Sequence, residues 1–347
     1  MTSAGDKTVV PPVGSSPMRR RSATIYDVAE LAGVSHQTVS RHLQGFPGIR
    51  PETRGRVEQA ISTLDYRPNL SARSLITGRS HRIGALTHEI DQIGPSRIVQ
   101  GAAAAARRAG YVLDIVTLDS ADEDGIAKSL EMVNQQDLAG VIVLASSDEM
   151  TAAFNRTVFR VPVYLSSDED GMGGPTLSAA IDDVVDHLYR HGHRRFFHLG
   201  GPENWLAGQN RLRDYRAALA RRGLETVGSS FGDWSAAAGF AAAETLPSDV
   251  TAIISANDQM ALGALLALDQ RGLRVPEDVS VSGLDDIPEA QFYKPPLTTI
   301  HLDTVAQGAA ALARLLDRIS PGEFEITAAP PARVVFRAST GPVRGTR

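Results

Sequence analysis

Polar side chains near the N-terminus are spaced as the open face of a short helix. With Val39 and Leu43 pointing inward at helical spacing, that face carries His36, Gln37, Ser40, Arg41 and Gln44. Imidazole, amide, hydroxyl and guanidinium groups on one helix face can hydrogen-bond the base edges of a DNA major groove. The alternative interpretation is an ordinary helical hairpin whose polar face meets only water.

The residues around this face predict a compact three-helix unit. One side of a preceding helix carries Ile25, Val28, Ala29 and Ala32. Gly33 permits a left-handed turn, and Ser35 can cap the next helix. A third helix begins with proline in its first turn, at Pro51-Glu52-Thr53, and its apolar stripe is Val57, Ala60, Ile61 and Leu64.

A second group of chemically capable residues follows predicted strands in the C-terminal half. Asn257 follows the strand Thr251–Ser255, and Asp285 follows Val279–Gly283. Because ligands of open parallel sheets bind beyond the carboxyl ends of the strands, both positions are candidate ligand contacts. Each also suits a structural role, since asparagine is a good helix N-cap and aspartate is common in turns.

For two further side chains, the residue pattern allows either a ligand contact or a structural role. Arg213 lies among other arginines in the predicted helix Asn204–Arg221, and helical arginines are usually solvated. Trp234 follows a Gly-Asp turn, where its ring can pack in the core or stack on the apolar face of a pyranose.

From Arg82 onward, predicted strands and helices alternate, which is typical of a parallel α/β sheet. The expected strands are Arg82–Thr87, Tyr111–Thr117, Gly140–Ala145, Val161–Leu165, Arg195–Leu199, Glu225–Gly232, Thr251–Ser255, Val279–Gly283 and Arg333–Arg337. The expected helices are Ser96–Arg108, Asp124–Gln136, one between Ala145 and Val161, Ile181–Arg190, Asn204–Arg221, Ala236–Leu246, Asp258–Gln270 and Val305–Ile319. Two similar series predict two doubly wound subdomains that face each other.

Charge and composition narrow the class of protein. Residues 1–80 hold eleven basic and six acidic residues, a net charge of +5, which leaves −10 for the remaining residues. A basic head on an acidic body suits contact of the head alone with phosphate. The basic arm containing Met18-Arg19-Arg20-Arg21 either follows the DNA backbone or is a solvated tail.

The absence of cysteine excludes disulfides and thiolate metal sites. With no apolar signal or spanning segment, we expect a cytoplasmic protein and no membrane partner.

Several longer motifs, taken in order, resemble the lacI family of transcriptional regulators. They are residues 24–43, Tyr66–Leu75, Gly232–Ser235, Ala256–Gly263, Val281–Asp286 and Pro295–Ile300. The resemblance covers about residues 24–340. It implies a helix-turn-helix head and a body like periplasmic sugar-binding proteins, with the chain crossing about three times between the two body subdomains. The implied protein is a homodimeric repressor, not an enzyme, without cofactor or metal, whose operator affinity a small sugar controls.

The resemblance carries the DNA-contacting residues onto this chain. In the head they are Thr24, Tyr26, Ser35, His36, Gln37, Thr38, Ser40, Arg41 and Thr53. Residues 69–77 match a hinge segment that in the family forms a helix on operator DNA, with Asn69, Ala72 and Leu75 as contacts. Leu75 would wedge into the minor groove; the alternative is a linker leucine that the body covers.

The resemblance also implies an effector site. Its residues are His88, Pro95, Ile98, Ser166, Arg213, Trp234, Asn257 and Asp285. Guanidinium, amide and carboxylate groups suit sugar hydroxyls, so we expect a neutral sugar such as a galactoside. Ser166, Leu144 and Leu302 replace polar family residues, and His88 and Gln92 are also substituted, which leaves the identity of the sugar open.

The expected domain organisation follows from these motifs. Residues 1–22 form an arm, 23–67 the helix-turn-helix domain, 68–80 the hinge and linker, and 81–340 the effector-binding and dimerisation domain. Within the body, the N-subdomain is expected at about 81–177 and 302–331, and the C-subdomain at about 178–301 and 332–340. Residues 338–347 have no apolar repeat for a coiled coil, so a dimer is expected.

Two other classes of protein fit single features. A periplasmic sugar-binding module without a regulatory role would explain the body alone. A serine hydrolase would use Ser230 in the pattern Gly228-Ser229-Ser230-Phe231-Gly232, with Asp285 and His301 following, although that pattern belongs between a strand and an immediate helix. His191 and His193 can be read as a metal pair or as solvated histidines at a helix end that Gly192 stops.

Overall fold

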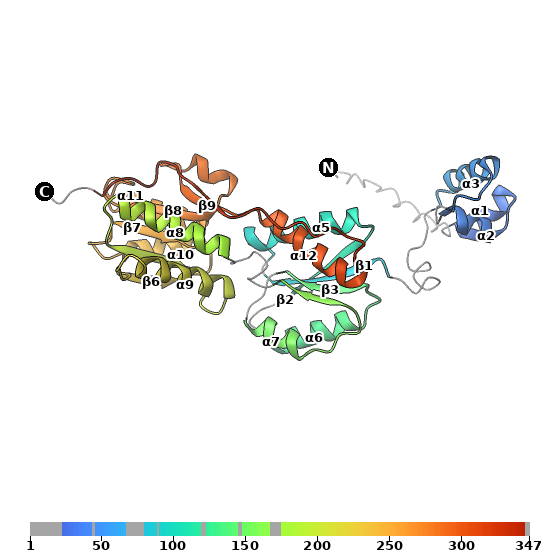
Figure 1. Cartoon of the computed structure of the whole chain (residues 1–347), viewed down its shortest axis with the longest axis horizontal. Helices are drawn as coiled ribbons and strands as arrows, with labels where there is room; N and C mark the ends of the chain where they lie inside the picture. The colour runs from blue at the N-terminus through green and yellow to red at the C-terminus, as the bar shows by residue number, and fades with distance from the viewer. Residues whose placement is uncertain are drawn as a thin grey trace, which may run out of the picture. The chain divides into compact units, whose positions relative to one another are not determined.

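The computed structural model (Figure 1) describes residues 23–43, 46–66, 80–88, 90–118, 123–144, 148–166 and 175–343. It divides between Arg79 and Ser80 into two compact units, a helical head and an α/β body. The N-terminal arm, Gln44 and the predicted hinge contacts Asn69, Ala72 and Leu75 lie outside the described residues. Among the residues that are described, no helix is both long enough and apolar enough to cross a membrane.

The head forms the three predicted helices. They are α1 (Ile25–Ala32), α2 (His36–Leu43) and α3 (Pro51–Thr63). Thr24 and Asp27 make a capping box at the start of α1, and Gly33 ends that helix with φ 66°. The Thr38 backbone N–H donates to Ser35 Oγ at 3.2 Å, which caps α2 as predicted. Val28, Val39 and Val57, one from each helix, are fully buried in the core of the head.

The first body sheet is parallel and has the strand order β2-β1-β3-β4. Its strands are β1 (Arg82–His88), β2 (Val112–Leu118), β3 (Gly140–Val143) and β4 (Val163–Leu165). Its helices are α5 (Ile93–Arg108), α6 (Glu123–Asn134), α7 (Asp148–Arg156) and α12 (Thr304–Ile319). Alternation along β1 points Ile83 towards α5 and α12 and Leu86 towards α6 and α7. Figure 1 shows these helix pairs on opposite faces.

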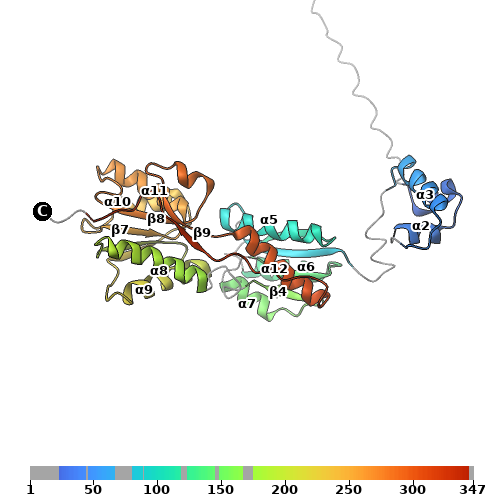
Figure 2. The ribbon, with the colours of Figure 1, turned by 45° about the horizontal axis from the view of Figure 1, so that its top comes forward.

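The second body sheet has the order β10-β9-β8-β7-β5-β6, with only β9 and β10 antiparallel. Its strands are β5 (Phe196–Gly200), β6 (Gly228–Phe231), β7 (Ala252–Ser255), β8 (Ser280–Asp285), β9 (Thr298–His301) and β10 (Arg333–Val335). Its helices are α8 (Pro175–Arg190), α9 (Leu206–Ala220), α10 (Ala236–Glu244) and α11 (Asp258–Gln270). Phe196 packs towards α8 and α9, whereas Phe197 packs towards α10 and α11. Figure 2 shows the two helix pairs on opposite faces of this sheet.

The C-terminal segment connects the two sheets. After β9 the chain enters α12, which packs on α5 against the first sheet, and then returns to the second sheet as β10. Gly101 on α5 and Gly308 on α12 allow the close approach, because a Cβ on either would overlap the backbone of the other helix. The predicted α/β architecture, with two doubly wound parallel subdomains and a helical head, is confirmed.

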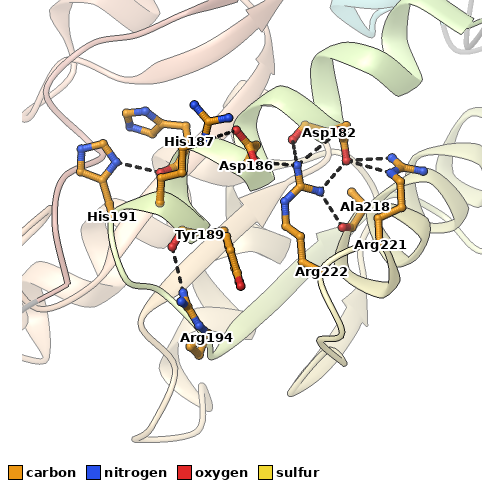
Figure 3. A network of polar contacts seen from close by, with 10 residues as sticks. Asp182, Asp186, His187, Tyr189, His191, Arg194, Ala218, Arg221 and Arg222 are labelled. Carbon is orange, nitrogen blue, oxygen red and sulfur yellow. Dashed lines mark hydrogen bonds and ion pairs between the residues drawn. The ribbon is translucent and has the colours of Figure 1, made fainter.

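An ion-pair network joins α8 to the end of α9 (Figure 3). Arg221 and Arg222 donate to Asp182 at 2.8 Å and 2.6 Å, and Arg222 also reaches Asp186 at 3.0 Å. The hydrogen bond from Arg222 is the main cause that lowers the pKa of Asp182 below its ordinary value. The network fixes two helices on the face of the second sheet away from α10 and α11.

Three local predictions are wrong. Strand β9, four residues that follow two prolines and pair with β8, was not predicted. Helix α8 begins at Pro175, earlier than the predicted Ile181. His193 is not solvated: it is 1% exposed, and its Nδ1 lies 3.1 Å from Thr251 Oγ1. Gly192, with φ 93°, does end the helix as predicted.

Candidate functional site

The exposed face of α2 in the head carries the predicted base-reading residues. His36, Gln37 and Arg41 are exposed, while Val39 on the opposite side is fully buried. The Tyr26 side chain, 65% exposed on α1, lies with its ring 5.2 Å from the His36 ring. These two adjacent helices therefore present one continuous polar and aromatic surface, as a groove-binding head requires.

Among the remaining predicted DNA contacts of the head, some side chains cap helices and others are half-buried. Thr24 and Ser35 are occupied as helix caps, and Thr38 lies within hydrogen-bond distance of Ser35 at 3.0 Å. Ser40 and Thr53 are half-buried at the edges of the helices. Capping hydroxyls and the N–H groups at helix N-termini are suitably placed for phosphate oxygens, so a structural role and a DNA role are compatible there.

The body contains a pocket lined by residues of both subdomains. From the first sheet and its helices come Gln92, Ile93, Gly94, Pro95, Ile98, Ser166, Thr304 and Gln307. From the second sheet and its loops come Trp205, Leu206, Ala207, Arg211, Trp234, Asn257, Gln259 and Asp285, with Leu302 on the connection. Asn257 and Asp285 lie at the carboxyl ends of β7 and β8, as the rule for parallel sheets predicts.

Arg211 is the cation of this pocket among the described residues. Its Nη2 lies 3.9 Å from Asp285 Oδ1, and its Nη1 donates to the Ala256 carbonyl. Its guanidinium lies 5.0 Å from the centre of the Trp234 ring. The side chains of Arg211 and Asp285 are only 12% and 11% exposed, so both charges are largely removed from water.

The structure does not bring Arg213 into the pocket, which corrects the sequence-based choice. Its side chain is 64% exposed and pairs with the neighbouring Asp214 at 3.2 Å. Residues two apart on a helix point about 200° apart, so only one of Arg211 and Arg213 can face the crevice. The packing of α9 places Arg211 there.

Asp285 combines a strained backbone conformation with burial of its carboxyl group. It is the last residue of β8 rather than a turn residue after the strand, and its φ is 112°. Burial raises the pKa of Asp285 to about 6, against the lowering effect of the Arg211 and Arg97 guanidinium groups. Burial, together with the charge of Asp285, raises the pKa of Asp258 to about 7. Asp258 also accepts hydrogen bonds from Thr299 Oγ1 at 2.5 Å and from the Ile287 N–H at 2.9 Å.

Asn257 and Trp234 each stabilise the local structure and also line the pocket. Asn257 caps α11 by accepting the Met260 N–H at 2.8 Å, and its amide donates to the Trp234 carbonyl at 2.9 Å. Trp234 has φ 68° and packs in the core beside Trp205. Its indole Nε1 is buried without a hydrogen-bond partner among the described residues. A Cβ on Gly201 would overlap the Trp234 ring, so Gly201 is needed for this placement.

Among the other predicted effector contacts, Pro95, Ile98 and Ser166 line the pocket. His88 ends β1, but its side chain lies outside the described part of the structure. Residues that line the pocket but were not predicted from the sequence include Trp205, Arg211, Gln259, Thr304 and Gln307. A usable signal existed for Trp205, because it follows β5 at the same sheet edge as Asn257 and Asp285.

The hydrolase interpretation fails on topology. Ser230 lies within β6 at one edge of the second sheet, whereas His301 lies on β9 with three strands between them. At about 4.8 Å per strand, those side chains are on the order of 19 Å apart. His301 Nδ1 instead lies 3.0 Å from Asp286 Oδ2, so no Ser-His-Asp arrangement forms.

Comparisons with known proteins agree with this geometry. Residues 24–69 match the family model described as bacterial regulatory proteins, lacI family, and residues 185–340 match that of a periplasmic binding protein-like domain. The lactose operon repressor of Escherichia coli (strain K12) is 32% identical over 311 residues, which cover 87% of this chain and 86% of that protein.

Solved structures are similar over nearly the whole chain. The lac repressor dimer bound to operator and the anti-inducer ONPF has a TM-score of 0.82 at 30% identity, covering 92% of this chain and 100% of that one. The complex of the transcriptional regulator CelR with cellobiose has a TM-score of 0.64 at 29% identity, covering 91% and 99%. These relatives are transcriptional regulators rather than enzymes or transport proteins. This chain belongs to the lacI family of bacterial regulatory proteins and is a DNA-binding transcriptional repressor.

Proposed function

We propose that the protein binds its operator as a dimer and that a small neutral sugar, a galactoside or another mono- or disaccharide, occupies the body pocket and controls operator affinity. In this proposal α2 reads bases in the major groove, with His36, Gln37 and Arg41 as the reading residues. Residues 69–77 are proposed to complete the contact in the minor groove. A regulator of this kind acts where its operator lies, so cytoplasmic, nucleoid-associated localisation is part of the proposal.

The observation that carries the effector assignment is the charge balance of the pocket. Of its described lining residues, only Arg211 and Asp285 are charged, and they neutralise each other at 3.9 Å. The other polar groups are amides and hydroxyls, which donate to and accept from sugar hydroxyls equally well. Trp234 adds a flat apolar surface for a pyranose face. Among the described lining residues there is no second cation for a phosphorylated or acidic ligand, and Arg97, whose charge also acts on Asp285, is not one of those residues.

Exposed apolar side chains on the body support the proposed dimer. Leu262 and Leu266 are one turn apart on α11 and are 40% and 53% exposed, and Phe292, which ends the short helix Pro288–Phe292, is 80% exposed. Large apolar groups of this kind are usually covered by a partner. The similarity to a lac repressor dimer bound to operator favours a second copy of this chain as that partner.

The proposed control follows from thermodynamic linkage. If sugar stabilises one arrangement of the two body subdomains and operator another, each ligand lowers the affinity of the other by the same factor. The complex of CelR with cellobiose supports a glycoside-type ligand for the pocket.

The test is calorimetric titration of the full-length protein with a panel of mono- and disaccharides, followed by operator binding with and without each sugar that binds. We expect at least one neutral sugar to bind and to change operator affinity. If no neutral sugar binds while a phosphorylated sugar or a nucleobase does, the effector assignment is wrong. Arg211→Ala should weaken the binding of that neutral sugar, and Arg213→Ala, which also removes an arginine from α9, is the matched control.

A further inference from the structure

The two tryptophans of this chain meet in the pocket. Trp205 comes from the segment between β5 and α9, and Trp234 comes from the segment between β6 and α10. Their ring centres lie 5.6 Å apart, and their planes are inclined at 55°. Both side chains are more than nine-tenths buried. The rings therefore form a fixed aromatic corner rather than two independent surface groups.

The surroundings of the two rings differ. Trp234 lies beside the polar groups of the pocket, with the Arg211 guanidinium over its ring and the Asn257 amide bonded to its carbonyl. Trp205 is followed by Leu206 and Ala207, which also line the pocket. Ile93, at the start of α5 on the other subdomain, packs on the same apolar cluster as the two tryptophans. One end of the pocket is thus suited to hydroxyl groups and the other to an apolar ring face.

A single pyranose cannot use both indoles. The two faces of a sugar ring are roughly parallel, whereas the two indole planes are inclined at 55°, so a ring stacked on Trp234 cannot also lie flat on Trp205. Two linked rings, with an angle between them, can place one face on each indole.

We propose, on the basis of the proposed function, that Trp205 is a second stacking site, specific for the second ring of a two-ring glycoside. The first ring occupies the end with Arg211, Asn257 and Asp285. The second ring lies on Trp205 and, from the opposite wall, meets Ile93. Because Ile93 belongs to the other subdomain, a two-ring ligand bridges the crevice more completely than a monosaccharide.

The experiment uses the tryptophans as separate reporters in the full-length protein. Trp205→Phe leaves Trp234 as the sole indole, and Trp234→Phe leaves Trp205. Each protein is titrated with two matched pairs of probes: cellobiose with methyl β-glucopyranoside, and lactose with methyl β-galactopyranoside. We expect the disaccharide that binds to change the fluorescence of both reporters and its monosaccharide partner to change that of Trp234 alone.

Affinity gives the second readout. Trp205→Ala should weaken disaccharide binding about tenfold and change monosaccharide binding less than twofold, and Trp205→Phe should restore most of the loss. Thermal unfolding and operator affinity of each variant show whether the fold is intact.

Equal losses for both members of a pair in an intact variant, or a silent Trp205 reporter with bound disaccharide, would overturn the second stacking site. Parent protein that binds methyl glycosides as tightly as disaccharides would also overturn it and would leave the sugar-effector proposal standing. Parent protein that binds no sugar of any kind would instead overturn the proposed function itself.

Discussion

The two walls of the body pocket are built from different chemistry. The wall from the second sheet holds both formal charges, Arg211 and Asp285, in a network fixed by strand ends and helix caps. The wall from the first sheet and its helices contributes apolar Ile93, Pro95 and Ile98 with uncharged polar groups. Charged hydrogen bonds discriminate strongly between hydroxyl patterns, whereas apolar contacts discriminate weakly. We infer that the wall from the second sheet, the selecting wall, selects the ligand. The wall from the first sheet, the closing wall, mainly contacts the ligand when the two subdomains close on it.

The largest expected effect is on the selecting wall. Arg211→Ala should weaken sugar binding about 100-fold, because it removes a charged donor and leaves Asp285 buried without its cation. Calorimetry measures the loss, and unchanged operator affinity shows that the head still functions. The exposed Arg213→Ala variant should stay within twofold of the parent. Similar losses in the two variants would mean that α9 does not separate the two arginines as described.

A second substitution tests how Gly201 holds the Trp234 ring in place in the selecting wall. Gly201→Ala should reduce sugar affinity about tenfold, because the added methyl group displaces the Trp234 ring. The control is Gly55→Ala on α3 of the head, which does not line the pocket and where an added Cβ meets nothing within 4 Å. Titration and tryptophan fluorescence follow both variants. Equal behaviour of the two would argue against a rigid Trp234 platform.

The pH dependence of sugar binding should come from the selecting wall. The ionised carboxylate of Asp285 accepts hydroxyl hydrogen bonds best, and its pKa is about 6. Sugar affinity should therefore be nearly constant above pH 7 and should fall up to about tenfold per pH unit below pH 6. Titrations between pH 5 and pH 8 measure this. Asp285→Asn should bind more weakly and lose that dependence; a variant that keeps it would exclude Asp285 as its source.

Stability should change with pH in the opposite sense. The pKa values of Asp258 and Asp285 are raised above that of an unfolded aspartate, so the folded state binds these protons more tightly. Their contribution to the unfolding free energy is complete below about pH 4. It is lost progressively above that pH, at ~1.4 kcal/mol per pH unit for each group, until the pH reaches the folded pKa of about 6 for Asp285 and about 7 for Asp258. Asp258→Asn should flatten this profile in denaturant unfolding of the full chain, and an unchanged profile would contradict the assignment.

The smallest effect is expected on the closing wall. Ile98→Val removes one buried methylene group from α5 and should destabilise the body by about 0.5–1.5 kcal/mol, with sugar affinity within threefold of the parent. Thermal unfolding and calorimetry separate the two quantities. A loss of sugar affinity as large as that of Arg211→Ala would remove the distinction between the walls.

The helical head was largely predictable because its signals are local. The left-handed Gly33 and the Ser35 cap, both predicted, act within three or four residues, and so does the Thr24–Asp27 capping pair, which was not predicted. The strand ends that carry Asn257 and Asp285 were also predictable, because buried parallel strands are continuous apolar runs. β9 was missed because its four residues gain their strand structure from pairing with β8 and β10.

The sequence by itself determined the class of regulator, the α/β body and the sheet edge at which the pocket lies. Only the tertiary structure decided which arginine faces the pocket. Helix α9 buries residues on several sides, including polar Asn210 and Asp214, so its pattern does not identify an inward face. Only tertiary structure also brought Trp205 to Trp234, since residues 29 positions apart meet through the parallel pairing of β5 and β6. Such contacts depend on how whole elements pack, and no local pattern of residues contains that information.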